Sequence, residues 1–227
     1  MLTMQGACWL CLQALKLTHH GICSFCLRKL PSMPICCLCC GLPTEHNHLA
    51  CGRCLQHPPS WQRLISVSPY QPPLRKLIHH YKFNPQPQLA FVLARVFVLH
   101  WLKGYRQHFW CKPQRLITIP SHPKRLWMRG FDHIASIGEY LSNWLNIPYS
   151  RNSLLRTRDT LAQITLKRHY RHSNLNGAFT LTGSVVGQHI AIIDDVLTTG
   201  ATMQTAAQLL ICAGAQTVQA WTICRTL

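Results

Sequence analysis

Hydrophobic and polar positions in the second part of this chain follow patterns that predict strands and helices in turn. Short apolar runs predict strands at residues 63–70, 115–120, 189–194 and 217–224. Apolar residues spaced three and four positions apart predict helices at residues 73–83, 88–104, 131–145 and 202–213. Strands that alternate with helices of this length are typical of a parallel sheet with helices on both faces. We therefore expect an α/β fold from about residue 61 onward.

The first part of the chain has a different pattern, in which cysteine pairs replace apolar periodicity. Most of the 13 Cys lie between residues 8 and 54, in pairs separated by two residues. This spacing lets two thiolates reach one metal ion, and two such pairs complete a tetrahedral Zn²⁺ site. We expect two structural Zn²⁺ sites, with the ligands Cys8, Cys11, Cys23 and Cys26 in one and Cys37, Cys40, Cys51 and Cys54 in the other. Metal would supply the folding energy of this segment.

The sequence leaves two parts of this assignment open. Cys36 with Cys39 has the same spacing as Cys37 with Cys40, which we prefer because Cys40 is followed by Gly41. The pairing of successive cysteine pairs is an assumption, because interleaved pairs would also close two sites. A disulfide framework is the alternative to metal, but a cytosolic chain with this many cysteines favours metal.

Composition narrows the class of protein further. The chain has 23 Lys and Arg against 6 Asp and Glu, and its formal charge of +17 favours anionic partners such as nucleic acid, phosphorylated metabolites or a membrane surface. Its 48% hydrophobic content excludes a disordered chain. The longest apolar stretch, residues 89–102, is too short to span a bilayer and contains Arg95 and His100. The N-terminus lacks the features of a secretory signal. We expect a cytoplasmic protein without a membrane span.

Two of the six carboxylates, Asp194 and Asp195, are adjacent at the end of a predicted strand. In parallel sheets, ligands bind where loops leave the carboxyl ends of strands. Two neighbouring carboxylates can each accept a hydrogen bond from one of two vicinal hydroxyls. The loop that follows can cradle a phosphate at a helix N-terminus with the backbone and hydroxyl groups of Thr198, Thr199, Gly200, Ala201 and Thr202. Together these residues predict a site for a ribose 5-phosphate.

The whole stretch IAIIDDVLTTGAT, residues 190–202, resembles the phosphoribosyl-pyrophosphate signature of type I phosphoribosyltransferases. Two further stretches, ITIPSHPKRLWMRGFDH (117–133) and LLRTRDTLAQITLKRHYRHSNLNGAF (154–179), are similar to segments of one branch, the ComF/GntX family, which is associated with DNA uptake and use. The cysteine pairs match the N-terminal double zinc ribbon of that family. The resemblance implies a double zinc ribbon at residues 1–57 and a type I phosphoribosyltransferase-like domain at residues 61–227.

The resemblance also implies an activity, which is Mg²⁺-dependent transfer of a phosphoribosyl group from phosphoribosyl pyrophosphate to an unknown acceptor. Asp194 and Asp195 would be catalytic and hold the ribose hydroxyls. The remaining substrate contacts would come from the arginine-rich stretches, at Arg125, Arg129, Gly130, Arg156 and Arg158. Guanidinium groups suit pyrophosphate oxygens because they donate two parallel hydrogen bonds. The family resemblance places this chemistry in DNA uptake, competence or the use of DNA as a nutrient.

The alternative is a non-catalytic accessory of DNA processing that retains the phosphoribosyl pocket and binds single-stranded DNA or DNA-uptake proteins. Trp127, which lies among basic residues, could stack on a base, although we expect it to pack inside the protein. Lys82, which lies at the end of the amphipathic helix predicted at residues 73–83, could reach a phosphate, although we expect it to be an exposed lysine. The chain has Asp132-His133 where the family often has Asn-Gln, and Asp132 would repel pyrophosphate unless it bound a metal.

Overall fold

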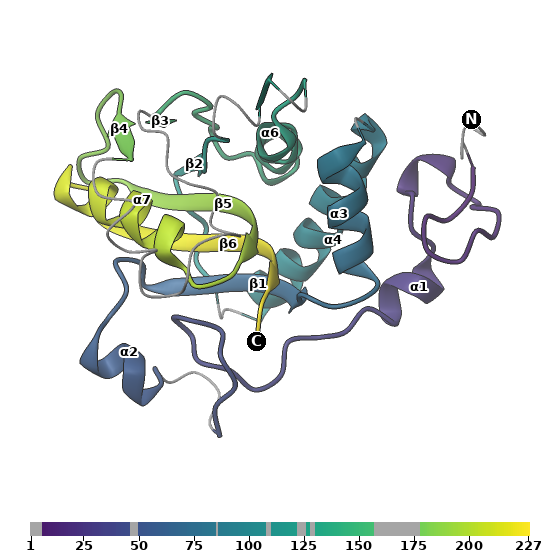
Figure 1. The fold of residues 1–227 in the computed structure, drawn as a ribbon, viewed down its shortest axis with the longest axis horizontal. Coiled ribbons are helices and arrows are strands. Elements are labelled where there is room, and N and C mark those ends of the chain that lie inside the picture. Colours follow the sequence, from purple (N-terminus) through teal and green to yellow (C-terminus); the bar gives the residue numbers. More distant parts are fainter. Residues whose placement is uncertain are drawn as a thin grey trace.

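A four-stranded parallel sheet forms the centre of the computed structural model (Figure 1). The structure describes residues 6–45, 50–84, 86–107, 110–121, 126–127, 130–156 and 178–227. The strands stand in the order β1-β6-β5-β2, and each neighbouring pair is parallel. Their bounds are Arg63–Pro69 for β1, Thr217–Arg225 for β6, His189–Leu197 for β5 and Arg115–Thr118 for β2. The predicted α/β class is confirmed.

Helices cover both faces of this sheet because its strands are apolar on both sides. The helices α3 (Leu74–Phe83), α4 (Pro87–Arg106) and α6 (His133–Leu145) share one core with Ala191 and Ile193 of β5. The helix α7 (Ala201–Cys212) covers the opposite core, which contains Ile190 and Ile192. Successive side chains of β5 therefore point to opposite faces, as a regular strand requires.

The strand β5 extends further than its apolar run predicts. It continues through the two aspartates to Leu197, because its pairing with β6 continues to the pair Leu197 and Arg225. A short antiparallel pair, β3 (Leu154–Arg156) with β4 (Phe179–Leu181), stands apart from the main sheet and was not among the predicted elements. Across the described ranges, no helix combines the length and the apolar character needed to cross a membrane.

The cysteine-rich segment has little regular structure and packs against the sheet and its helices. It contains the turn η1 (Thr18–His20) and the short helices α1 (Ser24–Arg28) and α2 (Gly52–Gln56). Figure 1 shows α1 at one side of the molecule and α2 beneath the sheet. This segment makes a main-chain contact with the edge strand β1, where Leu64 N–H donates to the Leu38 carbonyl at 2.8 Å.

Candidate functional site

The loop between β5 and α7 forms a small cavity at the carboxyl edge of the sheet. Gly200 stands at the N-cap of α7 with φ of 83°, a backbone conformation that favours glycine. The first N–H groups of a helix lack intrahelical partners, so they attract anions. The cavity of about 40 Å³ is lined by Asp194, Val196, Leu197, Thr198, Gly200, Ala201, Thr202 and Met203. The structure thus brings Asp194 together with four of the five predicted loop residues.

The fifth loop residue, Thr199, stabilises the turn instead. Its hydroxyl oxygen accepts a hydrogen bond from Ala201 N–H at 3.4 Å. The turn is continued by the first helical bond of α7, in which Gln204 N–H donates to the Gly200 carbonyl at 2.8 Å.

The two adjacent aspartates do not share this cavity. Because β5 continues through both residues, their side chains point to opposite faces of the sheet. Asp194 lines the cavity on the α7 side. Asp195 is only 6% exposed and lies on the side of α3 and α6. We expected each carboxylate to accept a hydrogen bond from one of two vicinal hydroxyls, and the structure places Asp194 rather than Asp195 in the lining of the cavity.

Asp195 is instead the centre of a buried charged cluster. Lys82 Nζ at the end of α3 lies 2.6 Å from Asp195 Oδ2, and His133 Nε2 at the start of α6 lies 3.0 Å from the same oxygen. A carboxylate only accepts, so the ring N–H of His133 donates. Burial would raise the pKa of Asp195, but Lys82 and then His133 outweigh it and hold that pKa below its usual range. Asp195 is therefore ionised and links two helices to the sheet.

Lys82 and His133 were missed as site residues by sequence reasoning. Our expectation of an exposed Lys82 is wrong, since its side chain is 24% exposed and pairs with Asp195. Burial lowers its pKa, but attraction to Asp195 outweighs this effect and leaves the pKa raised. The position of His133 is fixed further by Tyr81, whose hydroxyl donates to the His133 carbonyl at 2.9 Å. A lysine at the end of an amphipathic helix carried no signal that its partner lies in β5.

The carboxyl of Asp194 has the opposite electrostatic environment. Burial, and then repulsion by Asp195, raise its pKa to about 7, against the attraction of Lys82 and Arg156. A raised pKa indicates a carboxylate that would be stabilised by a cation or a hydrogen-bond donor entering the cavity. Of the two carboxylates, Asp194 combines a place in the cavity lining with a raised pKa, which makes it the candidate for contact with a ligand.

The predicted pyrophosphate-binding residues are described only in part. Arg156 ends β3, with its guanidinium 5.7 Å from the centroid of the Phe179 ring. Gly130 is exposed with φ of 73°. Arg125, Arg129 and Arg158 lie outside the described residues.

Asp132 has a structural role that the sequence did not suggest. It is the N-cap of α6, and its Oδ1 accepts hydrogen bonds from Ile134 N–H at 3.2 Å and Ala135 N–H at 3.3 Å. An N-cap carboxylate satisfies the helix donors and interacts favourably with the helix dipole. These hydrogen bonds account for an Asp at this position without a metal.

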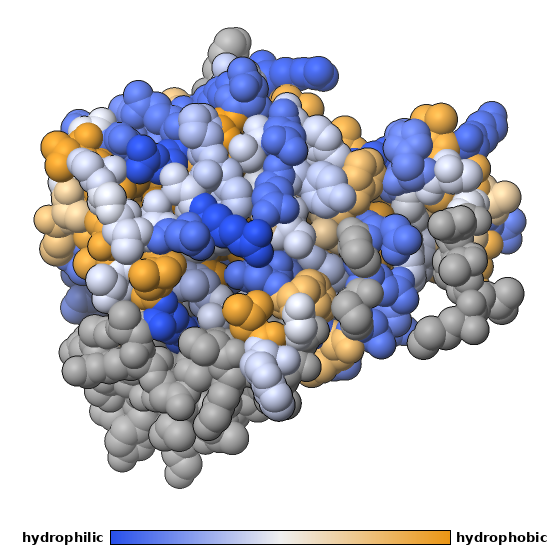
Figure 2. Space-filling model, turned by 90° about the horizontal axis from the view of Figure 1, so that it is seen from above, coloured by the Kyte–Doolittle hydropathy of each residue, from blue (hydrophilic) through white to orange (hydrophobic). Residues whose placement is uncertain are grey.

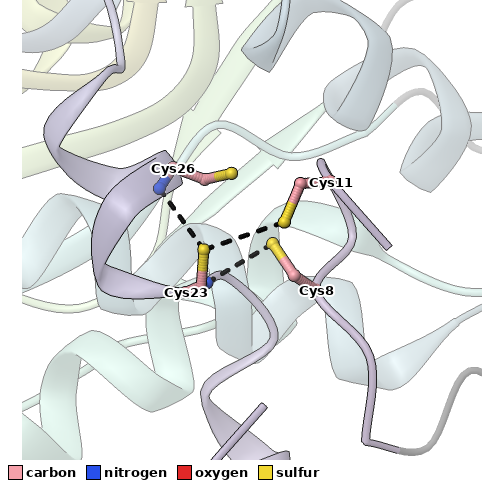
Figure 3. A group of neighbouring side chains, drawn as sticks. All are labelled: Cys8, Cys11, Cys23 and Cys26. Atoms are coloured by element: carbon pink, nitrogen blue, oxygen red, sulfur yellow. Dashed lines mark hydrogen bonds between the residues drawn. The ribbon is translucent and has the colours of Figure 1, made fainter. Parts of the chain in front are cut away.

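Each predicted cysteine tetrad is brought together in the structure. The sulfur atoms of Cys8, Cys11, Cys23 and Cys26 lie within 4.8 Å of one another, and so do those of Cys37, Cys40, Cys51 and Cys54. Figure 3 shows the first group, whose sulfurs turn toward a common centre. A tetrahedral Zn²⁺ with Zn–S bonds of about 2.3 Å requires sulfurs about 3.8 Å apart. The sulfurs of Cys11 and Cys23 are 3.9 Å apart in the first group, and those of Cys40 and Cys51 are 3.7 Å apart in the second.

The two groups repeat the same local geometry. In each, the backbone N–H of the third cysteine donates to the sulfur of the first, from Cys23 to Cys8 at 3.4 Å and from Cys51 to Cys37 at 3.2 Å. Such hydrogen bonds stabilise a thiolate. Successive pairs share a group, and the second group contains Cys37 with Cys40 rather than Cys36 with Cys39. The donor set and its spacing fit two structural Zn²⁺ ions.

Comparison with known proteins identifies the class and then the family. Residues 149–227 match the family model of the phosphoribosyl transferase domain. The chain is 45% identical over 227 residues to the DNA utilization protein YhgH of Escherichia coli O157:H7, with 100% of both chains covered. It is 33% identical over 221 residues to competence protein F of Haemophilus influenzae, with 96% of each covered. It is 27% identical over 160 residues to competence protein ComFC of Streptococcus pneumoniae, covering 70% of this chain and 67% of the relative.

The fold, the β5–α7 loop and this match define a phosphoribosyltransferase-type domain. The chain belongs to the ComF/GntX family.

Proposed function

We propose that this chain binds phosphoribosyl pyrophosphate with Mg²⁺ in the β5–α7 cavity and acts in the uptake or use of DNA. The observation that carries the proposal is the cavity itself, in which Asp194 faces a helix N-terminus across a loop of threonines. The family match supports the phosphoribosyl ligand, and the names of the relatives support the role in DNA use.

Each side of the ligand would meet complementary groups. The 5-phosphate would be held by Thr198, Thr199, Gly200, Ala201 and Thr202, where the dipole of α7 favours negative charge. Asp194 would accept hydrogen bonds from the ribose hydroxyls. Asp195, held by Lys82 and His133, would keep the end of β5 in place and add negative charge behind the ring. The pyrophosphate would meet Arg125, Arg129, Gly130, Arg156 and Arg158.

Phosphoribosyl transfer needs no protein nucleophile. The bond between C1 and the pyrophosphate oxygen breaks with its electrons leaving on oxygen, and a lone pair of the acceptor forms the new bond to C1. The carboxylates would stabilise the positive charge that develops on the ring, and the loop would fix its orientation. Oxygen donors such as Asp194 and the phosphates suit Mg²⁺, which would neutralise the leaving pyrophosphate.

Calorimetric titration of Mg²⁺-phosphoribosyl pyrophosphate into zinc-loaded protein tests this proposal. The wild type should bind, and Asp194→Asn should weaken binding by about tenfold or more, because one hydrogen bond to a charged group contributes about 1.5–3 kcal/mol. Glu139→Gln is the matched control, since this carboxylate is exposed and pairs with the exposed Arg151. A folded wild type that gives no binding heat would contradict the proposal.

The DNA-binding accessory remains a second candidate because of one observation. Trp127 is 86% exposed, so the expectation that it packs inside the protein is wrong, and its ring is available to stack on a base. Figure 2 shows hydrophobic side chains scattered among many hydrophilic ones on one face of the molecule, and the chain carries a net charge of +17. A charge of this size favours a polyanionic partner.

We expect Trp127→Ala to weaken binding of a single-stranded oligonucleotide by about 1–3 kcal/mol, as loss of one stacked base does. Fluorescence anisotropy over a series of salt concentrations measures this, and affinity should fall steeply with salt. Trp144→Ala is the control, because that ring is already packed against Phe91 and Tyr140. Equal affinities for the two variants would remove the stacking role of Trp127.

A further inference from the structure

One buried guanidinium joins the second cysteine group to the loop between β5 and α7, residues 198–202, which is called the phosphate-binding loop below. Arg225, at the end of β6, is only 5% exposed. Its Nε–H donates to the Cys40 carbonyl at 2.6 Å, within the second cysteine group. Its NH1 group donates to the Leu197 carbonyl at 3.0 Å and to the Thr198 carbonyl, which begin the loop. The Arg225 side chain therefore donates to main-chain carbonyls of both the second cysteine group and the loop.

A second side chain makes the same connection independently. The indole Nε1–H of Trp61 donates to the Cys39 carbonyl at 2.6 Å, next to the Arg225 contact. The Trp61 ring packs against Gly200, where a Cβ atom would lie 3.3 Å from its nearest atom. The turn at residues 37–41, which carries Cys37 and Cys40 and is called the knuckle below, therefore has two adjacent carbonyls held by side chains. Trp61 and Arg225 hold these carbonyls, and the same two side chains touch the two ends of the loop.

Gly41 permits the close approach that these contacts need. It follows Cys40 with φ of 70°, and a Cβ atom there would lie 2.6 Å from Leu64 Cδ2 and 3.2 Å from Arg225 Cγ. A larger residue would crowd the Leu64 and Arg225 side chains, and the positive φ would strain it in any case. The backbone of this knuckle is therefore fitted to the end of the sheet.

The first cysteine group is attached elsewhere. Its segment is held by Arg95 of α4, whose NH1 group donates to the His20 carbonyl at 3.4 Å and the Ile22 carbonyl at 3.3 Å. These contacts end on a helix of the core and reach no residue of the loop. In the described part of the chain, each cysteine segment thus has an arginine clamp, meaning an arginine that holds its main-chain carbonyls: Arg95 for the first and Arg225 for the second. Of these two, Arg225 touches the phosphate-binding loop.

We propose that the second cysteine group, when it holds its metal, positions the phosphate-binding loop through Arg225 and Trp61, and that the first group has no such role. The proposal rests on the proposed function, because the loop is taken to bind the phosphate of a phosphorylated ribose. Metal bound by four thiolates fixes the backbone of the knuckle. That backbone supplies fixed acceptors for Arg225 and Trp61, so the loop is ordered before the ligand arrives and binding costs less entropy.

The coupling is reciprocal by thermodynamic necessity. A ligand that binds the ordered loop should strengthen metal binding at the second group by the same factor by which the metal strengthens ligand binding. The first group should show no such change.

The test compares matched variants of the two clamps in the full-length, zinc-loaded protein. Arg225→Lys and Trp61→Phe keep most of the packing but remove hydrogen bonds to the knuckle, and Cys40→Ser removes a sulfur from the second group. Arg95→Lys and Cys11→Ser are the equivalent changes at the first. One readout is the dissociation constant for Mg²⁺-phosphoribosyl pyrophosphate by calorimetry. The other is hydrogen exchange of the peptide covering residues 195–204, which needs no ligand.

We expect the variants of the second clamp to weaken ligand binding by about tenfold and to speed exchange in the loop, since tenfold corresponds to about 1.4 kcal/mol. The variants of the first should change neither quantity. Equal effects at both clamps, or unchanged exchange and affinity at the second, would overturn the inference while leaving the proposed function intact. If the wild type binds no phosphoribosyl pyrophosphate, the proposed function fails, and the exchange data alone decide whether the second group orders the loop.

Discussion

Asp195→Asn should destabilise the protein at pH 8, whereas the same substitution at the neighbouring Asp194 should stabilise it. Asp195 forms a buried cluster with Lys82 and His133, and removing one partner of a buried ion pair costs about 3–5 kcal/mol. At about 2–4 °C per kcal/mol for a chain of this size, the melting temperature should fall by about 6 °C or more. Asp194→Asn removes a carboxylate whose ionisation is opposed by burial.

The pH dependence of the two effects should also differ. The pKa of Asp194 is raised from 3.8 to about 7, so its stabilising contribution is present below pH 3.8 and is lost as the pH rises through 7. The gain from Asp194→Asn should therefore appear at pH 8 and vanish by about pH 4. The pKa of Asp195 is lowered, so its contribution is present above 3.8 and is lost only in stronger acid. The loss from Asp195→Asn should persist at pH 5.

Differential scanning calorimetry of both variants at pH 5 and pH 8 measures these shifts, and titration with phosphoribosyl pyrophosphate at pH 8 completes the comparison. The stabilised Asp194→Asn protein should be the one that loses the ligand. A control is the double variant Lys82→Met/Asp195→Asn, which leaves no unpaired lysine and should recover part of the stability. Destabilisation of similar size at both aspartates would show that they share one environment.

Zinc content should separate the cysteines that bind metal from those that do not. The wild type should contain two Zn²⁺ per chain, one for each cysteine group. Cys40→Ser should reduce this to one, because its sulfur is 3.7 Å from that of Cys51, a tetrahedral spacing. Cys39→Ser should retain both ions, because the Cys39 thiol points away and donates to the Gln62 carbonyl at 3.8 Å. Elemental analysis of dialysed protein measures the content.

The effect on folding should be large, since structural Zn²⁺ sites contribute about 10–16 kcal/mol of apparent binding free energy in small zinc domains. Cys36→Ser is a second control with the alternative spacing, and it should also retain two ions. Loss of zinc from Cys36→Ser or Cys39→Ser but not from Cys40→Ser would reverse the assignment of this cluster.

The sequence predicted the main sheet and its helices because their apolar periodicity is strong. It did not predict that β5 continues to Leu197, since Asp194 and Asp195 interrupt the apolar run that defined the strand. The extension depends on pairing with β6, which is a property of the assembled sheet. The small β3–β4 pair was missed because its strands have only three residues each.

The candidate site was predicted as a set of residues, but the arrangement of its charges was not. Asp194 and the loop residues are only a few positions apart in the sequence, so their order in the chain was enough to predict that they line one cavity. Asp195 is paired with Lys82, more than one hundred positions earlier, and such a contact has no local signature. Arg225 was missed for the same reason, although a charged residue closing an apolar strand is a signal worth following.

The strand β1 is the edge of the main sheet, and part of that edge is covered by the second cysteine segment through the bond from Leu64 to Leu38. An uncovered edge strand offers its backbone to other chains and promotes edge-to-edge association. Oxidation or chelation that loosens this segment would therefore expose a template for aggregation next to the binding loop. We therefore expect the second cysteine segment to guard the domain against aggregation in addition to holding the loop.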